Sequence, residues 1–148
     1  MYKFNLEPLL NHQRFIEEQH QKALAKIRRK LEEQNALLEQ LLRKEATMTA
    51  HLKEKQSESL SSDDLILYRH YFDRLRKDVA RQRERVQETE RCFRVKKEEL
   101  IEAVKKRKML EKLKEKGLSA YQEKLLRKEQ AELNEAALNV YNRSQLPK

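Results

Sequence analysis

The residues of this chain that could do chemistry are few and scattered. Glu17 and His20 have the spacing of one ligand pair in a helical di-iron site, but such a site needs a second pair of that kind, which the sequence lacks. The remaining histidines, His12, His51 and His70, have no serine or cysteine arranged beside them for activation. A phosphate-binding loop of the form GxxxxGK[ST] needs two glycines, and the chain has one. We therefore expect no enzyme activity, no metal site and no cofactor.

The single cysteine, Cys92, excludes an internal disulfide and falls at a flanking heptad position, where we expect a half-buried small side chain. The first ten residues, MYKFNLEPLL, lack the apolar core of a signal peptide. No apolar run approaches the roughly 18 residues of a membrane-spanning helix. We expect a soluble, cytoplasmic chain with no direct membrane insertion.

Composition favours long helices over an ordinary globular domain. Charged residues make up 40% of the chain and hydrophobic ones 38%, with one Gly, two Pro and no Trp. The net charge of +9 is concentrated in residues 61–117, which carry 18 basic and 12 acidic side chains. The run VKKRKMLEKLKEK (104–116) is similar to a nucleic-acid patch, but Glu111 and Glu115 interrupt it. A solvated or protein-binding face is the favoured interpretation, and we expect no nucleic acid partner.

A first helix is predicted over residues 5–57. Asn5 is a candidate N-cap, and Pro8 falls in the first turn, where its missing N–H costs no intrahelical bond. Apolar residues follow a 3-4 spacing along two stretches, joined by a step of four from Ile27 to Leu31 that predicts a stutter. The predicted seam comprises Leu6, Leu9, Gln13, Ile16, His20, Ala23, Ile27, Leu31, Gln34, Leu38, Leu41, Glu45, Met48 and Leu52.

A second helix is predicted over residues 64–142, after a turn at about 58–63. The stretch KQSESLSSDD interrupts the periodicity, and Ser61 with Asp64 provides a helix N-terminal cap. The heptads that follow are unbroken, which is typical of a coiled coil. This seam comprises Leu65, Tyr68, Phe72, Leu75, Val79, Gln82, Val86, Thr89, Phe93, Lys96, Leu100, Ala103, Arg107 and Leu110.

The two helices are expected to form one all-α domain, 1–148, an antiparallel coiled-coil hairpin whose second helix overhangs the first. With the turn near residue 60, residue i should face roughly residue 120 − i. The first helix is then used up where Gly117 appears, and a helix break is possible there because Gly is a weak helix former.

Apolar side chains away from the seam are the features that the hairpin leaves unexplained. The overhang must find a partner, fold back locally or leave its apolar stripe unburied. These side chains are Phe4 and Phe15 near the start, Leu42, Ile66, Leu67 and Tyr71 near the turn, and Leu118, Tyr121, Leu125, Leu133, Ala136 and Val140 on the overhang.

Both ends of the sequence resemble a known family. The stretch YKFNLEPLLNHQRFIEEQHQKALA resembles the start of the flagellar export protein FliJ family, in which F-x-L-x-x-L-L opens a long helix. The stretch LEKLKEKGLSAYQEKLLRKEQAELNEAA is similar to that family's C-terminal pattern, with Asn134-Glu135 in place of its usual Asp-Glu. The resemblance covers about half of the chain, and the middle matches in length and heptad character.

This resemblance implies a non-enzymatic component of the bacterial flagellar type III export apparatus, in the cytoplasm and peripherally associated with the inner membrane. The implied role is that of a central stalk with three kinds of partner: the hexameric export ATPase, the export gate membrane protein and the export chaperones. For the ATPase side we expect contacts through Phe4, Leu118, Tyr121, Leu125, Leu133 and Val140, and for the export-gate side through Leu42, Tyr68, Tyr71 and Phe72.

Two alternatives stay open at the level of the sequence. The stalk of a virulence-type III secretion ATPase has the same architecture. A generic coiled-coil adaptor or a nucleic-acid-binding rod would share the heptads, and a steep salt dependence of DNA affinity would indicate the latter.

Overall fold

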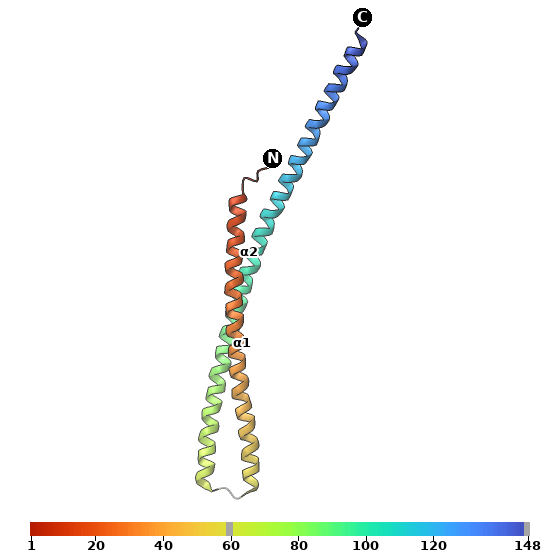
Figure 1. Ribbon diagram of the computed structural model, residues 1–148. Coiled ribbons are helices and arrows are strands. Elements are labelled where there is room, and N and C mark those ends of the chain that lie inside the picture. The colour runs from red at the N-terminus through yellow and green to blue at the C-terminus, as the bar shows by residue number, and fades with distance from the viewer. Residues whose placement is uncertain (59–60, 147–148) are drawn as a thin grey trace. The chain divides into compact units, whose positions relative to one another are not determined.

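The chain folds into two long helices, α1 (Glu7–Ser57) and α2 (Ser62–Gln145), seen in the computed structural model of Figure 1. The structure describes residues 1–58 and 61–146, and all regular secondary structure in these ranges is helical. The predicted turn at 58–63 therefore lies partly outside the described residues. The predicted all-α hairpin is confirmed, because the two long helices contact each other and form a hairpin.

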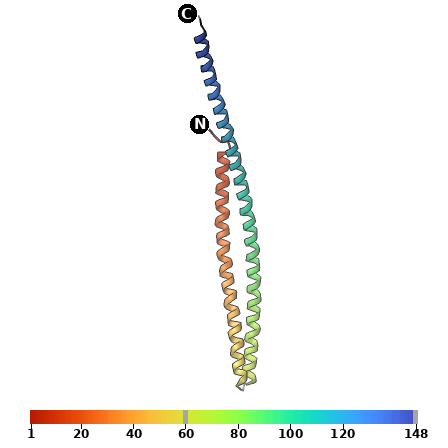
Figure 2. The same ribbon diagram turned by 90° about the vertical axis from the view of Figure 1, so that its right-hand side faces the viewer.

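The chain divides into two compact units. The turn unit comprises Glu18–Glu102, and the end unit comprises Met1–Glu17 together with Ala103–Lys148. Each unit contains a part of α1 and a part of α2, the two helices drawn in Figure 2.

In the turn unit the helices are antiparallel. His20 lies 3.6 Å from the Glu99 carboxylate, and His51 shares a hydrogen bond of 3.2 Å with the Tyr68 hydroxyl. The residue numbers of each pair sum to 119, one less than the predicted sum of 120. The predicted α2 seam holds the buried side chains of this unit: Leu75, Val79, Gln82, Val86 and Thr89.

The two buried polar seam residues of the turn unit, Gln82 and Thr89, are hydrogen-bonded within it. The Gln82 amide nitrogen donates to the Gln34 side-chain oxygen at 2.6 Å and to the Gln34 backbone carbonyl at 2.9 Å. The Thr89 hydroxyl donates to the Arg85 carbonyl one turn earlier. Burial of these groups therefore leaves no cost from unpaired donors.

The N-terminal half of the α1 seam differs from the prediction. Leu10 is fully buried at 0% exposure, whereas the predicted Leu9 is 43% exposed, and the charged Glu17 is buried at 9%. Leu10, Glu17 and Leu24 lie whole heptads before Leu31 and share the seam with the predicted Ile16 and Ala23, which are half-buried. The stutter therefore stays a prediction. Periodicity analysis treats a carboxylate as a surface group, and it therefore missed Glu17 as a seam residue.

The N-terminal cap of α2 agrees with the prediction from the sequence, whereas that of α1 differs from it. Ser61 caps α2, because its hydroxyl accepts a hydrogen bond of 3.3 Å from the Asp64 N–H, as predicted. At α1 the Leu6 carbonyl accepts the first helical bond, from Leu10, and the Glu7 N–H donates to the Phe4 carbonyl. Leu6 therefore takes the cap position predicted for Asn5, and backbone groups of residues 4–6 satisfy the helix start.

Candidate partner-binding surfaces

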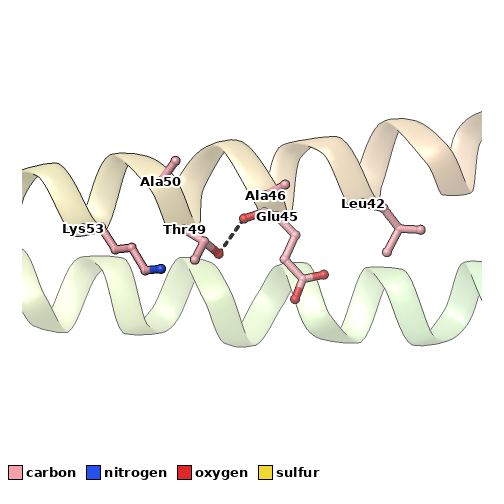
Figure 3. A pocket seen from close by; sticks show the side chains of 6 residues that line it. All are labelled: Leu42, Glu45, Ala46, Thr49, Ala50 and Lys53. Carbon is pink, nitrogen blue, oxygen red and sulfur yellow. Dashed lines mark hydrogen bonds between the residues drawn. The ribbon is translucent and has the colours of Figure 1, made fainter.

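The first surface in the turn unit is a groove of about 480 Å³ along α1. Figure 3 shows its six lining side chains, all from α1, with two alanines between longer neighbours. The Thr49 hydroxyl donates to the Glu45 carbonyl at 2.8 Å and so carries no free hydrogen (Figure 3). The lining comprises Leu42, Glu45, Ala46, Thr49, Ala50 and Lys53.

The second surface is a groove of about 400 Å³ that both helices line, near the turn. Tyr68 is half-buried here and hydrogen-bonded to His51, and the Lys55 ammonium lies 5.9 Å from its ring centroid. Tyr71 is 42% exposed and also lines an adjoining groove beside Lys44. The lining of the second groove comprises Met48, Lys55, Asp64, Leu67, Tyr68 and Tyr71.

The four residues expected on the export-gate side do not share one surface. Tyr68 and Tyr71 line the same groove, whereas Phe72 is half-buried in the seam. Leu42 directly follows a seam residue, and Tyr71 directly precedes one, as does its groove neighbour Lys44. In an antiparallel pair such positions flank the seam on opposite edges, so Leu42 lies on the other edge of the turn unit from Tyr71.

The end unit has a polar seam built around Arg107. The Arg107 guanidinium donates through Nε to the buried Glu17 carboxylate and through Nη1 to Glu111 at 2.8 Å. Arg14 approaches Glu111 from α1 at 3.6 Å. The hydrogen bond to Glu111, followed by that to Glu17, raises the pKa of Arg107 above its ordinary value. The same hydrogen bond from Arg107 lowers the pKa of Glu111.

One heptad further along α2, the Lys114 ammonium lies 2.9 Å and 3.1 Å from the two oxygens of the Glu7 carboxylate. Acids on α1 thus meet bases on α2 at both Glu7 and Glu17. These two pairs of opposite charges favour the register in which α1 and α2 pack in the end unit.

Gly117 continues the α2 seam, and α2 is helical through it. The Tyr2 side chain lies against this glycine, so that a Cβ at position 117 would overlap the Tyr2 hydroxyl and lie 3.0 Å from its Cζ. The Tyr2 ring also packs against the Tyr121 ring at a centroid distance of 5.7 Å. Glycine therefore admits the N-terminal segment close to the α2 backbone, a contact that helix propensity alone does not reveal.

Beyond Tyr121, α2 has no packed face. Every side chain from 122 to 146 is exposed. Of the residues expected on the ATPase side, Leu118, Leu125, Leu133 and Val140 are exposed, whereas Phe4 is half-buried and Tyr121 is engaged by Tyr2 and by the Met1 ammonium. Leu126 and Tyr141 are exposed too and were not predicted as contacts. The residues one heptad before them, Ser119 and Asn134, are polar, so no apolar heptad repeat pointed to them.

The described ranges lack sites of two other kinds. Residues 1–58 and 61–146 hold no group of three or more His, Cys, Asp or Glu side chains able to bind a metal ion. Over the same ranges, neither helix has a stretch apolar enough to cross a membrane.

The fold and these surfaces define an all-α hairpin with exposed apolar side chains. The family model of the flagellar FliJ protein matches residues 2–146, and the chain belongs to this family. It is therefore a component of the flagellar export apparatus, in a family of non-catalytic components. No curated protein and no solved structure matches the chain.

Proposed function

We propose that the chain acts as a central-stalk-like coiled coil in flagellar protein export. The end unit, with the exposed helix of residues 122–146, enters the ring of the hexameric export ATPase. The turn unit contacts the export gate, and export chaperones bind the same rod. The chain would work in the cytoplasm, held at the inner membrane through these partners.

The exposed apolar stripe of α2 carries this proposal. Most helix stability in proteins comes from packing an apolar face against other structure, and residues 122–146 of α2 pack no such face. Leu125, Leu133 and Val140 recur at helical spacing and lie within about 60° of Leu118 around α2, counted at 3.6 residues per turn. A ring that surrounds the helix would bury this stripe.

A charge substitution on the stripe tests the ATPase contact. We expect Leu133→Glu to abolish most of the stimulation of ATP hydrolysis, because burying a carboxylate in an apolar contact is costly. Leu138→Glu is the matched control, since Leu138 is 61% exposed against 65% for Leu133 and lies about 140° away around the helix. Equal loss of stimulation in both variants, or in neither, would remove the stripe from the proposal.

The groove that contains Tyr71 supports the gate contact. Aromatic side chains that line an exposed groove are typical anchors of protein interfaces. We expect Tyr71→Ala to weaken binding of the gate's cytoplasmic part by about 1 kcal/mol or more, with unchanged helicity. Leu42→Ala, on the other edge, distinguishes the two grooves. If Leu42→Ala weakens binding and Tyr71→Ala does not, the contact belongs to the α1 groove.

A further inference from the structure

The exposed end of α2 carries its charges in two blocks. Residues 124–128 hold three basic side chains and no acid, and residues 129–135 hold three acids and no base. Arg127 already pairs with Glu123 along the helix at 3.0 Å. The first block contributes Lys124 and Lys128 to one flank of the helix, and the second block contributes Glu132 and Glu135.

These four charges lie on one flank of the apolar stripe. At 3.6 residues per turn, Lys124 and Lys128 project about 80–120° to one side of Leu118, and Glu132 and Glu135 project about 40–100° to the same side. The other side of Leu118 carries Leu126 among neutral and apolar side chains, with Glu123 at its far edge, and Glu129 lies within the stripe, about 20° from Leu118. A charged flank on one side of an apolar stripe is the arrangement by which paired helices select a partner and its orientation.

The sequence of charges along this flank is complementary to itself in the antiparallel sense. Two copies related by a two-fold axis near residue 130 place Lys128 of each copy opposite Glu132 of the other, and Lys124 beside Glu135. In the same alignment, Leu125 of one copy lies near Leu133 and Ala136 of the other. A parallel pair would instead bring the two basic blocks to the same height along the helices, and the two acidic blocks likewise, so that no opposite charges meet.

We propose that the exposed end of α2 binds a second copy of this chain, through an antiparallel pairing of residues 118–145. Each copy then covers the apolar stripe of the other, and the two charged flanks meet. The contact is one pair of helices about 40 Å long, so we expect a weak dimer that exchanges readily with monomer.

Self-pairing also has a consequence that rests on the proposed function. The stripe of the free chain is covered until the ATPase ring displaces the second copy. The pairing itself is tested with the purified chain alone, so its failure and the failure of the stalk proposal are distinguishable.

Sedimentation equilibrium of the full chain at low salt measures the dimer directly. We expect the dissociation constant to rise at least tenfold in Lys124→Glu/Lys128→Glu, and likewise in Glu132→Lys/Glu135→Lys, because each variant places like charges together. An equimolar mixture of the two variants should recover association, since each supplies the charges that the other lacks. Lys77→Glu/Arg91→Glu is the control for Lys124→Glu/Lys128→Glu, with the same change in net charge at exposed positions of the turn unit.

Added salt distinguishes the orientation. An antiparallel pair is held together partly by opposite charges and weakens as salt rises, whereas a parallel pair of like blocks would strengthen. Far-UV circular dichroism establishes that each variant keeps its helices. A wild-type chain that is monomeric at every concentration, a mixture that stays dissociated, or a dimer that strengthens with salt would each overturn the proposal.

Discussion

Substitution of Gly117 by alanine separates intrinsic helix propensity from the contact with Tyr2. Alanine is favoured over glycine inside a helix by about 0.8–1.0 kcal/mol. At this position the new Cβ would overlap the Tyr2 hydroxyl, so the Tyr2 ring must move away from α2 and from Tyr121. A pair of aromatic rings contributes about 0.5–1.5 kcal/mol beyond area burial.

The two contributions nearly cancel in the wild-type background. We therefore expect Gly117→Ala to change the free energy of unfolding by less than about 0.5 kcal/mol. In a Tyr2→Ala background there is no ring to displace, and the same substitution should stabilise the protein by about 0.8–1.0 kcal/mol. Urea unfolding of the four proteins, followed by far-UV circular dichroism, gives the coupling between the two positions.

The control for this cycle is Ser119→Ala. Ser119 is exposed on the same turn of α2. Its replacement by alanine should raise the free energy of unfolding slightly, and by an equal amount with or without Tyr2. If Gly117→Ala were equally stabilising in both backgrounds, Tyr2 would not lie on Gly117. The glycine would then be a simple weakening of the helix.

Two further predictions concern the polar seam of the end unit. Glu17→Ala should lower the free energy of unfolding by about 1–3 kcal/mol, because Arg107 loses its more buried partner. Glu17→Leu with Arg107→Leu should restore at least wild-type stability in urea, since an apolar pair needs no desolvation of charge; a double variant less stable than Glu17→Ala would contradict this. Because the hydrogen bond from Arg107 lowers the pKa of Glu111, the stabilising contribution of Glu111 is complete above its ordinary value of 4.5 and is lost as pH falls through the lowered value. Acid titration of helicity should show this loss in the wild type and not in Glu111→Gln, and identical acid profiles would exclude the role of Glu111.

The α2 helix could be predicted from its sequence because its seam is apolar or uncharged at nearly every position of the turn unit. The cap at Ser61 follows in the same way, since its side chain acts locally. The α1 seam was misplaced where Glu17 is buried, because its partner Arg107 is 90 residues away in the chain. A periodicity that counts only apolar residues cannot recognise an ion pair between two helices.

The candidate surfaces were predictable in composition and not in arrangement. Leu42 and Tyr71 both stand out as apolar residues off the seam, and their heptad positions give their edges, but the grooves that they line depend on how neighbouring side chains lie. Gly117 stood out as a weak point of the helix, whereas the structure shows a close approach of Tyr2. Such an approach depends on where the first six residues lie, and no local pattern encodes that.

The stalk role is tested most directly by removing the exposed end of α2. A chain ending at Tyr121 keeps both seams and the contact of Tyr2 with Gly117, so circular dichroism should show the loss of the deleted helix only. The measurement is ATP hydrolysis by the hexameric export ATPase as the truncated chain is titrated against the full one. The stalk proposal predicts that stimulation is abolished, whereas full stimulation by the truncated chain would contradict it.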